Sequence, residues 1–184
     1  MNNAYWKWNK QIPKSVCQAL IDEVNQDGYL SKAKVGTGSG GINEELRNNR
    51  TFFLKPNHWF EGILYNHIRY ANESTGWNYN IQGCQSVQYT HYSIGEKYEW
   101  HRDHDMYELS QLMEYRKLTA VCQISAAEDF TGGGLYLKEC GEESIISEQG
   151  DIVVFPSNLE HRAATVESGE RITVVCWAYG NHFV

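Results

Sequence analysis

Apolar side chains recur with two different periods along the chain, and the change falls near residue 80. Upstream, segments 12–28 and 57–74 repeat apolar residues every three to four positions, which predicts two amphipathic helices. The first begins near Pro13 and ends before Gly28, residue types that favour those two ends of a helix. The apolar stripes consist of Val16, Leu20 and Val24 in the first segment and of Trp59, Ile63, His67 and Tyr70 in the second.

Downstream, the period approaches two. Short runs rich in β-branched and aromatic residues alternate with glycine and polar turns, which predicts strands. These runs are CQSVQYTHY, KLTAVCQIS, GLYLKE, ESIIS, DIVVFP and RITVVCWAYG. Strands that follow helices predict a mostly β fold, a barrel or jelly roll buttressed by N-terminal helices. We expect one domain over 1–184, with helical support over about 1–80 and a barrel core over about 81–180.

The composition narrows the class of protein. With 184 residues, 41% apolar content and 13% aromatic residues, the chain can bury a substantial core. A formal net charge of −7 provides no broad basic face for phosphates, which disfavours a nucleic-acid partner. No stretch approaches the roughly 18 apolar residues of a membrane span, and the start MNNAYWKWNK lacks the apolar core of a signal peptide. We therefore expect a cytoplasmic protein with no membrane partner, whose oligomeric state the pattern does not set.

The number and spacing of the cysteines agree with the expected cytoplasmic location. The five cysteines are widely spaced and include no C-x-x-C pair, which disfavours a disulfide framework and a Cys-rich zinc site. Cys122 and Cys176 lie in strand-like runs, where a free thiol is usually a small buried hydrophobic group. We expect both to be buried.

The stretch HRDHD at 101–105 is the first candidate for metal chemistry. His101 and Asp103 could supply two ligands of a 2-His-1-carboxylate site, which holds iron(II) and leaves three positions open. His161, directly after the strand DIVVFP, is the best candidate for the third ligand. Zinc is the alternative metal, because a His, His, Asp set also binds it. His104 and Asp105 are expected beside a ligand or in solvent rather than on the metal.

Arg171 opens the strand RITVVCWAYG, and alternation places it on one face with Thr173, Val175 and Trp177. If that face lines the barrel, the guanidinium is buried and needs an anionic partner. Its own strand offers no acidic residue on that face, so a dicarboxylate ligand would be a suitable partner. The competing interpretation is that Arg171 lies on the surface at the end of the strand.

Two motifs carry a resemblance to a known family. YSIGEKYEWHRD fits Y-x-x-G-x-x-Y-x-x-H-x-D, and HRAATVESGERITVVCW resembles H-x-V-x-P-V-x-x-G-x-R-x-x-x-V-x-W. Both are typical of the iron(II) and 2-oxoglutarate dependent dioxygenases of the prolyl 4-hydroxylase-like superfamily, especially small microbial, phage-borne and PKHD-type members. The resemblance covers about residues 84–180. INEELRNNRTFFL is similar to the family's D-x-x-x-R-x-S segment, with Asn49 in place of the serine.

The resemblance implies a double-stranded β-helix with the metal at its open end. The iron ligands it implies are His101, Asp103 and His161. Arg171 would bind the distal carboxylate of 2-oxoglutarate, Tyr92 would donate a hydrogen bond to this co-substrate, and Gln123 would lie beside it. Tyr98 would line the pocket. Water exclusion by aromatic side chains is expected of Tyr92, Tyr98, Trp100 and Trp177.

The activity implied by the resemblance uses Fe(II), 2-oxoglutarate and O2, with ascorbate as reductant. It would hydroxylate an unactivated C–H bond, with a prolyl residue of a peptide or protein loop as the leading substrate, and release succinate and CO2. The glycine-rich GTGSGG at 36–41 predicts a mobile loop that could cover such a substrate. The alternatives are a hydroxylase of a free amino acid or small metabolite, and a non-catalytic barrel that senses 2-oxoglutarate or metal.

Overall fold

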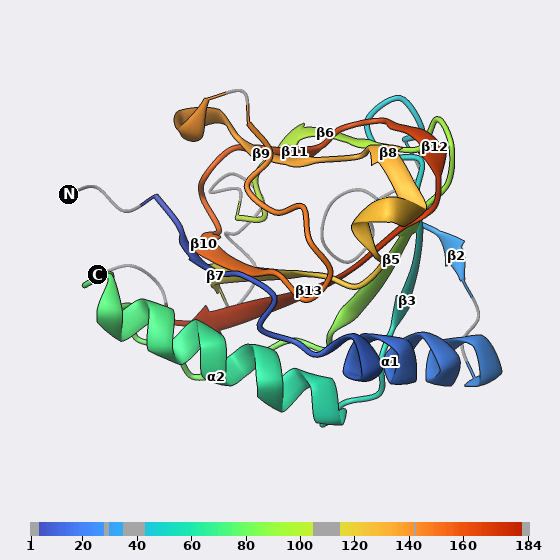
Figure 1. Ribbon diagram of the computed structural model, residues 1–184. Helices are drawn as coiled ribbons and strands as arrows, with labels where there is room; N and C mark the ends of the chain where they lie inside the picture. The colour runs from blue at the N-terminus through green and yellow to red at the C-terminus, as the bar shows by residue number, and fades with distance from the viewer. Residues whose placement is uncertain (1–3, 28–29, 35–42, 105–114, 142, 182–184) are drawn as a thin grey trace.

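Antiparallel strands in two layers make up most of this computed structural model (Figure 1). The described residues are 4–27, 30–34, 43–104, 115–141 and 143–181. The larger sheet follows the order β1–β10–β7–β13–β5–β3–β2, and β4 also pairs with β13. Its strands are β1 (Trp6–Trp8), β2 (Ser31–Lys32), β3 (Arg50–Phe53), β4 (Gly83–Cys84), β5 (Gln88–Tyr92), β7 (Tyr115–Gln123), β10 (Ile152–Pro156) and β13 (Arg171–Gly180).

The second layer consists of two small sheets that lie across from the larger one (Figure 1). One has the order β6–β11–β9 and the other pairs β12 with β8. Their strands are β6 (Tyr98–His101), β8 (Phe130–Gly132), β9 (Leu135–Leu137), β11 (His161–Ala163) and β12 (Val166–Gly169). The short 3-10 helices η2 (Ala127–Asp129) and η3 (Lys138–Cys140) flank β8 and β9. This layering confirms the predicted double-stranded β-helix.

Two helices, α1 (Lys14–Asp27) and α2 (Trp59–Ser74), lie along the outer face of the larger sheet (Figure 1). Leu20 of α1 and Phe60, Leu64 and Ile68 of α2 are fully buried and share one apolar cluster with sheet residues such as Leu118. The predicted helices are therefore present close to their expected bounds. Burial of their apolar faces anchors them to the outer face of the sheet.

The buried stripe of α2 differs from the expected one by one position. Trp59 and Tyr70 are 44% and 56% exposed, while the adjacent stripe faces the sheet. The exposed aromatics have other partners: the Trp59 indole donates to Glu23 at 2.9 Å, and the Tyr70 ring lies 6.1 Å from that of Trp6. Because α2 is apolar on two sides, its period alone does not identify the side that packs on the sheet.

The N-terminal part is not purely helical. β1 pairs with β10, with Trp6 opposite Val154, and β3 pairs with β5, with Thr51 opposite Thr90. The expected division near residue 80 thus separates the helices from most of the barrel but assigns β1, β2 and β3 to the wrong side. These strands are at most four residues long, too short for a period of two to be visible.

The segment ESIIS, predicted as a strand, is irregular. Its residues Ile145 and Ile146 are buried in a cluster with Leu137 and Phe155, and the amide of Ile145 donates to the carbonyl of Leu135. Its apolar character reflects packing rather than a strand ladder. Conversely, β6, β8, β11 and β12 were not predicted, because their sequences are polar and short.

The other expectations about the chain have mixed outcomes. Cys122 and Cys176 are fully buried and all five cysteines are free, as expected. Within the described ranges, no helix is long and apolar enough to cross a membrane. The glycine-rich segment 36–41 and Asp105 lie outside the described residues.

Candidate metal and co-substrate site

His101, the last residue of β6, lies directly opposite His161, the first residue of β11, in an antiparallel pair. Asp103 follows β6 by two residues, and candidate ligand atoms of the three side chains all lie within 4.8 Å of one another. The Nε2 atom of His101 is 3.7 Å from Oδ1 of Asp103, and Nε2 of His161 is 3.5 Å from Oδ2. The sequence-predicted ligands are thus brought together as two imidazoles facing one carboxylate, a set that suits a divalent metal.

Both imidazoles are held in the same tautomer. Nδ1 of His101 donates to the carbonyl oxygen of Glu99 at 2.7 Å, and Nδ1 of His161 donates to that of Leu159 at 3.0 Å. Because a carbonyl oxygen can only accept, each Nδ1 carries the proton and each Nε2 keeps its lone pair. Such a backbone acceptor behind a histidine is the usual device that orients a metal ligand.

The electrostatics favour the metal-binding forms of these groups. Burial lowers the pKa of His101 to about 3, and the neighbouring His161 adds to this effect. Burial alone would raise the pKa of Asp103, but His161, His101 and Arg116 outweigh it and lower the pKa to about 2. At neutral pH the site therefore presents a neutral imidazole and a carboxylate, the forms that bind metals.

Asp103 is held from the larger sheet. The hydroxyl of Thr119, on β7, donates to Oδ2 of Asp103 at 2.8 Å and also lies 2.9 Å from the hydroxyl of Ser157. Both Thr119 and Ser157 are fully buried. The carboxylate therefore has one oxygen fixed by a strand of the opposite layer, which sequence reasoning missed because nothing in TAVCQ marks this threonine.

Aromatic rings pack on both histidines. Tyr98 stacks on His101 with ring centroids 3.4 Å apart and an interplanar angle of 11°. Phe155 meets His161 edge-on at 4.8 Å, and the guanidinium of Arg47 lies 4.5 Å from the Tyr98 ring. Tyr98 thus contacts the site as expected. Arg47, from the segment similar to the family's D-x-x-x-R-x-S, supports it from behind and donates to Asn49 at 2.8 Å.

Arg171 is buried inside the barrel, not at the surface. It is 2% exposed, pairs in register with Tyr92, and its guanidinium lies 5.6 Å from the Tyr92 ring. Its Nε donates to Oε1 of Gln123 at 3.1 Å, whereas its buried Nη2 has no hydrogen-bond partner among the described residues. No acidic side chain within the described part of the chain pairs with it. Burial lowers the pKa of Arg171 to about 10.

An anion would satisfy this guanidinium, because a buried cation with a free N–H group is costly. Gln123 is fixed by donating to the carbonyl and hydroxyl of Ser125 at 3.2 and 2.9 Å, so its oxygen stays turned to Arg171. Burial raises the pKa of Tyr92, which keeps its hydroxyl protonated and able to donate. Arg171, Gln123 and Tyr92 therefore fit the carboxylate end of a 2-oxoglutarate molecule.

Gly133 makes room for Arg171. A Cβ atom at Gly133 would lie 3.0 Å from Cδ of Arg171, and the residue has a φ of +64°, a conformation that glycine adopts easily. The turn that contains Gly133 thus shapes the wall beside the guanidinium.

Arg116 is a further cation near the metal ligands. Its guanidinium lies 3.8 Å from the Trp177 ring, its Nε donates to Gln85 at 2.9 Å, and it helps to lower the pKa of Asp103. The pairing of β7 with β13 shifts register between Ala178 and Tyr179, next to Arg116. Period-two alternation along β7 therefore did not predict that the Arg116 side chain lies near the site. Arg116 and Trp177 form a polar and aromatic pair close to the site.

The remaining candidates lie elsewhere. Arg102 points away and donates to Glu160 at 3.2 Å. His104 is 4% exposed and lies against Tyr115, so it is buried near the site rather than in solvent. His91 faces Glu170 at 3.3 Å, on the opposite side of β5 from Tyr92. Trp100, expected to exclude water from the site, instead contacts the guanidinium of Arg162 at 4.9 Å.

A double-stranded β-helix that holds two histidines, one aspartate and a buried arginine defines a class of metal-dependent oxygenases. The family model described as the 2OG-Fe(II) oxygenase superfamily, where 2OG is 2-oxoglutarate, matches residues 87–179. The chain belongs to this superfamily, and the family's cofactors are Fe(II) and 2-oxoglutarate with O2 as oxidant.

Curated relatives include PKHD-type hydroxylases. One from Psychrobacter sp. (strain PRwf-1) is 36% identical over 90 residues, which cover 47% of this chain and 34% of that protein. Another, from Shewanella sp. (strain ANA-3), is 30% identical over 90 residues, which cover 48% and 40%. The chain therefore covers well under half the length of the curated relatives it matches.

Solved structures with the same fold include two prolyl hydroxylases. A viral collagen prolyl hydroxylase from Paramecium Bursaria Chlorella virus-1 superposes with a TM-score of 0.75 at 20% identity, over 97% of each chain. A prolyl hydroxylase from Trichoplax adhaerens, in complex with a peptide fragment of hypoxia inducible factor, gives 0.76 at 16% identity, over 97% of this chain and 84% of that one. At these identities the likeness establishes the fold.

Proposed function

We propose that this chain is an Fe(II)- and 2-oxoglutarate-dependent hydroxylase that acts on a prolyl residue of a peptide or protein and releases succinate and CO2. The observation that carries the proposal is the buried Arg171, whose Nη2 has no partner in the described part of the chain, in the same barrel as the three candidate ligands. A metal site alone would not require this arginine. A dicarboxylate co-substrate that binds the metal accounts for both the metal site and the buried arginine.

His101, Asp103 and His161 would hold the iron through the two Nε2 atoms and a carboxylate oxygen. Bound Fe(II), 2-oxoglutarate and O2 supply an oxidative decarboxylation that is coupled to hydroxylation of a C–H bond. The protein's own contribution is to orient the reactants and exclude water. Thr119 keeps the Asp103 carboxylate in place, and the two backbone carbonyls keep the imidazoles turned toward it.

Arg171 would anchor the far carboxylate of 2-oxoglutarate. A guanidinium suits this task because its planar fork matches both carboxylate oxygens, and burial strengthens each hydrogen bond. Gln123 already engages Nε, so the remaining N–H groups are left for the co-substrate. Tyr92, at the same register position, would donate its hydroxyl to the same carboxylate.

A prolyl substrate is supported by Arg116 and Trp177. The peptide carbonyls next to proline accept hydrogen bonds from a guanidinium, and the Arg116 guanidinium lies over the Trp177 ring at 3.8 Å. The Arg116 side chain is already ordered by Trp177 and Gln85, so little conformational entropy is lost when it engages a peptide. The Trichoplax adhaerens prolyl hydroxylase was solved with a peptide fragment, which supports a peptide substrate here by analogy.

The test is a turnover assay with mass detection. Purified protein is supplied with Fe(II), ascorbate and 2-oxoglutarate, and succinate is measured with and without pools of proline-containing peptides. We expect peptide-stimulated succinate and a peptide mass gain of one oxygen atom. Proline-free pools and free amino acids are the comparison arms. Oxygen gain on a free amino acid alone would redirect the substrate class, and no succinate from metal-loaded protein would reject the enzyme.

His101→Ala is the negative control for this assay. Equal oxygen gain with the native and variant proteins would mean that the proposed site is not responsible.

A further inference from the structure

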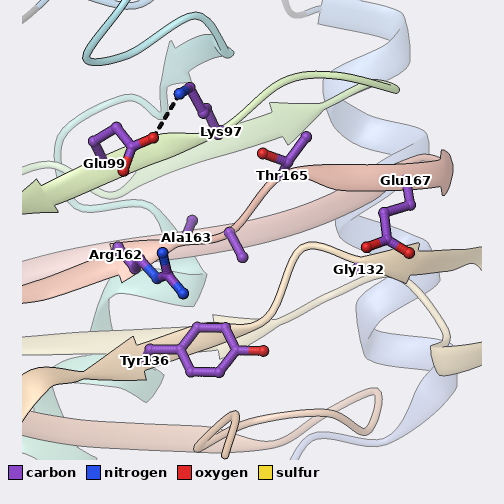
Figure 2. A pocket seen from close by; sticks show the side chains of 9 residues that line it. Lys97, Glu99, Gly132, Tyr136, Arg162, Ala163, Thr165 and Glu167 are labelled. Carbon is purple, nitrogen blue, oxygen red and sulfur yellow. Dashed lines mark hydrogen bonds and ion pairs between the residues drawn. The ribbon is translucent and has the colours of Figure 1, made fainter. Parts of the chain in front are cut away.

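A pocket of about 260 Å³ lies on the outer face of the second layer, away from the metal ligands. It is lined by side chains of β6, β9, β11 and β12 and by the backbone at Gly132 (Figure 2). Arg162 follows His161 on β11, so its side chain leaves the opposite face of the strand. The oxygenase site makes no use of this pocket.

The Arg162 guanidinium is held between two aromatic rings. Its central carbon lies 4.9 Å from the Trp100 ring and 5.1 Å from the Tyr136 ring. Figure 2 shows it extending from β11 toward the middle of the pocket, above Tyr136. Rings on a guanidinium restrict its rotation and leave its N–H edge available for an anion.

Arg162 lacks a counter-ion, whereas its neighbours have one. Lys97 pairs with Glu99 at 2.5 Å, and Arg102 and Lys138 share Glu160 at 3.2 and 2.9 Å. Within the described residues, Arg162 makes neither an ion pair nor a hydrogen bond through its guanidinium, and its Nε is buried without a partner. A preoriented cation without an anion, set in a pocket, is the arrangement that binds a carboxylate.

Glycine keeps the pocket open. Gly132 has a φ of +71°, and a Cβ atom there would lie 2.9 Å from Cγ of Glu167 and 2.4 Å from the Thr165 carbonyl oxygen. A Cβ atom at Gly134 would lie 2.9 Å from Cε2 of Tyr136. A side chain at position 134 would therefore press on the Tyr136 ring beneath Arg162.

We propose that this pocket binds a carboxylate, with Arg162 as its anion-binding residue. Glu167 lies across the pocket from Arg162 in Figure 2 and repels a doubly charged phosphate about twice as strongly as a singly charged carboxylate, so a single carboxylate is the better match. The volume suits a group of amino-acid size. The carboxylate belongs either to a free amino acid or to an acidic side chain of a peptide.

Calorimetric titration of the holoprotein tests the proposal. Fe(II) and one molar equivalent of 2-oxoglutarate are present under nitrogen, so that the Arg171 site is filled, no excess dicarboxylate competes for the pocket and no turnover occurs. The probes are free glutamate, a capped Ala-Glu-Ala peptide and its Ala-Gln-Ala counterpart. We expect a carboxylate probe to bind and the glutamine peptide to bind at least tenfold more weakly, because the neutral amide loses a charge-assisted pair.

Two variants and a matched control assign the binding to the pocket. Arg162→Gln should weaken the carboxylate probe about tenfold or more, and Thr165→Trp should do the same by filling the space while retaining the charge. Arg69→Gln, at an exposed arginine on α2, should leave binding unchanged. Circular dichroism and thermal unfolding verify that each variant is folded.

The outcomes separate the two sources of the carboxylate. Binding of glutamate alone indicates a free metabolite, and binding of the glutamyl peptide alone indicates a protein partner. Absence of heat with both probes, or binding that Arg162→Gln leaves intact, overturns the proposal. Because turnover is not the readout for binding, failure of the proposed hydroxylase activity would leave this test unaffected.

Discussion

His101 and His161 face each other as register partners, and each donates its Nδ1 proton to the carbonyl oxygen two residues before it. The same local device thus sets both imidazoles from two strands far apart in sequence. Because these acceptors are backbone atoms, the orientation does not depend on further side chains. The two Nε2 atoms are therefore held toward Asp103, an arrangement in which the three side chains can share one metal ion.

Removing one imidazole should abolish tight metal binding. His161→Ala is expected to lose more affinity for Fe(II) than the roughly 10- to 100-fold that loss of an outer hydrogen-bond partner costs, because a ligand itself is gone. Calorimetry with Fe(II) under nitrogen measures this. His67→Ala, on α2, is the matched histidine control and should bind metal as the native protein does. Equal affinity of His161→Ala and native protein would remove His161 from the site.

Thr119→Val tests the support behind the carboxylate. Valine has nearly the shape of threonine, so the variant removes the 2.8 Å hydrogen bond to Oδ2 of Asp103 with little change in packing. We expect metal affinity or turnover to fall about 10- to 100-fold. Fe(II) titration and succinate formation report the two effects. Thr173→Val, at another buried threonine, controls for loss of a hydroxyl in the larger sheet.

The sequence predicted the residues whose spacing is local and missed those that depend on strand register. His101 and Asp103 share one motif, and His161 and Arg171 follow from strand ends and alternation, so these positions were accessible. Thr119 reaches Asp103 only because β7 lies across from β6, and no periodicity encodes that crossing. The confirmed fold class rests on the change of period near residue 80.

Helix α2 shows the same limit in the core. Trp59 and Tyr70 belong to a second stripe that also contains large apolar groups, but only the stripe of Phe60 and Leu64 faces the sheet. Tertiary packing decides which stripe of α2 faces the sheet, since Trp6 and Trp8 of β1 provide ring contacts for Tyr70 on the other stripe. Two faces that both carry large apolar groups cannot be ranked by period alone.

Arg171→Met should separate stability from co-substrate binding. In the absence of 2-oxoglutarate, the buried guanidinium, with Nη2 unpartnered within the described ranges, is unfavourable, so methionine should leave the free energy of unfolding equal or higher. The variant should lose affinity for 2-oxoglutarate at least about tenfold. Thermal unfolding with and without 2-oxoglutarate measures both. At about 100 times Kd the native protein should gain about 2.7 kcal/mol from the ligand, and the variant should gain far less.

An outcome that runs against this interpretation is a strong loss of stability without ligand. It would mean that Arg171 serves packing rather than anion binding. Retained 2-oxoglutarate stabilisation would place the co-substrate elsewhere.

Asp151 should make the fold sensitive to acid. It is fully buried and accepts from the backbone amide of Lys10 at 2.9 Å, while the Lys7 ammonium lies 3.0 Å away. Burial acts to raise its pKa, but Lys10, Lys7 and two further amides outweigh it, so the folded pKa lies below 3.8. Its stabilisation is then complete above about pH 4 and is lost as the pH falls through the folded pKa.

Denaturant unfolding between about pH 3 and 7 checks this expectation. Asp151→Asn should cost about 2 kcal/mol at neutral pH, because charge-assisted hydrogen bonds are lost, and should flatten the acid limb of the curve. Asp22→Asn, at an exposed side chain of α1 that accepts from Gln18, is the control and should change little. An unchanged acid limb in Asp151→Asn would assign the acid sensitivity to other groups.

Arg116→Gln should distinguish substrate binding from co-substrate chemistry. If the guanidinium beside Trp177 binds a peptide carbonyl, its loss should raise KM for a proline-containing peptide about tenfold, the worth of one charge-assisted hydrogen bond. KM for 2-oxoglutarate, which depends on Arg171, should change little. Arg116 also helps to lower the pKa of Asp103, so Fe(II) affinity is measured in parallel. A rise in both KM values together with weaker metal binding would show that Arg116 supports the metal site instead of the peptide.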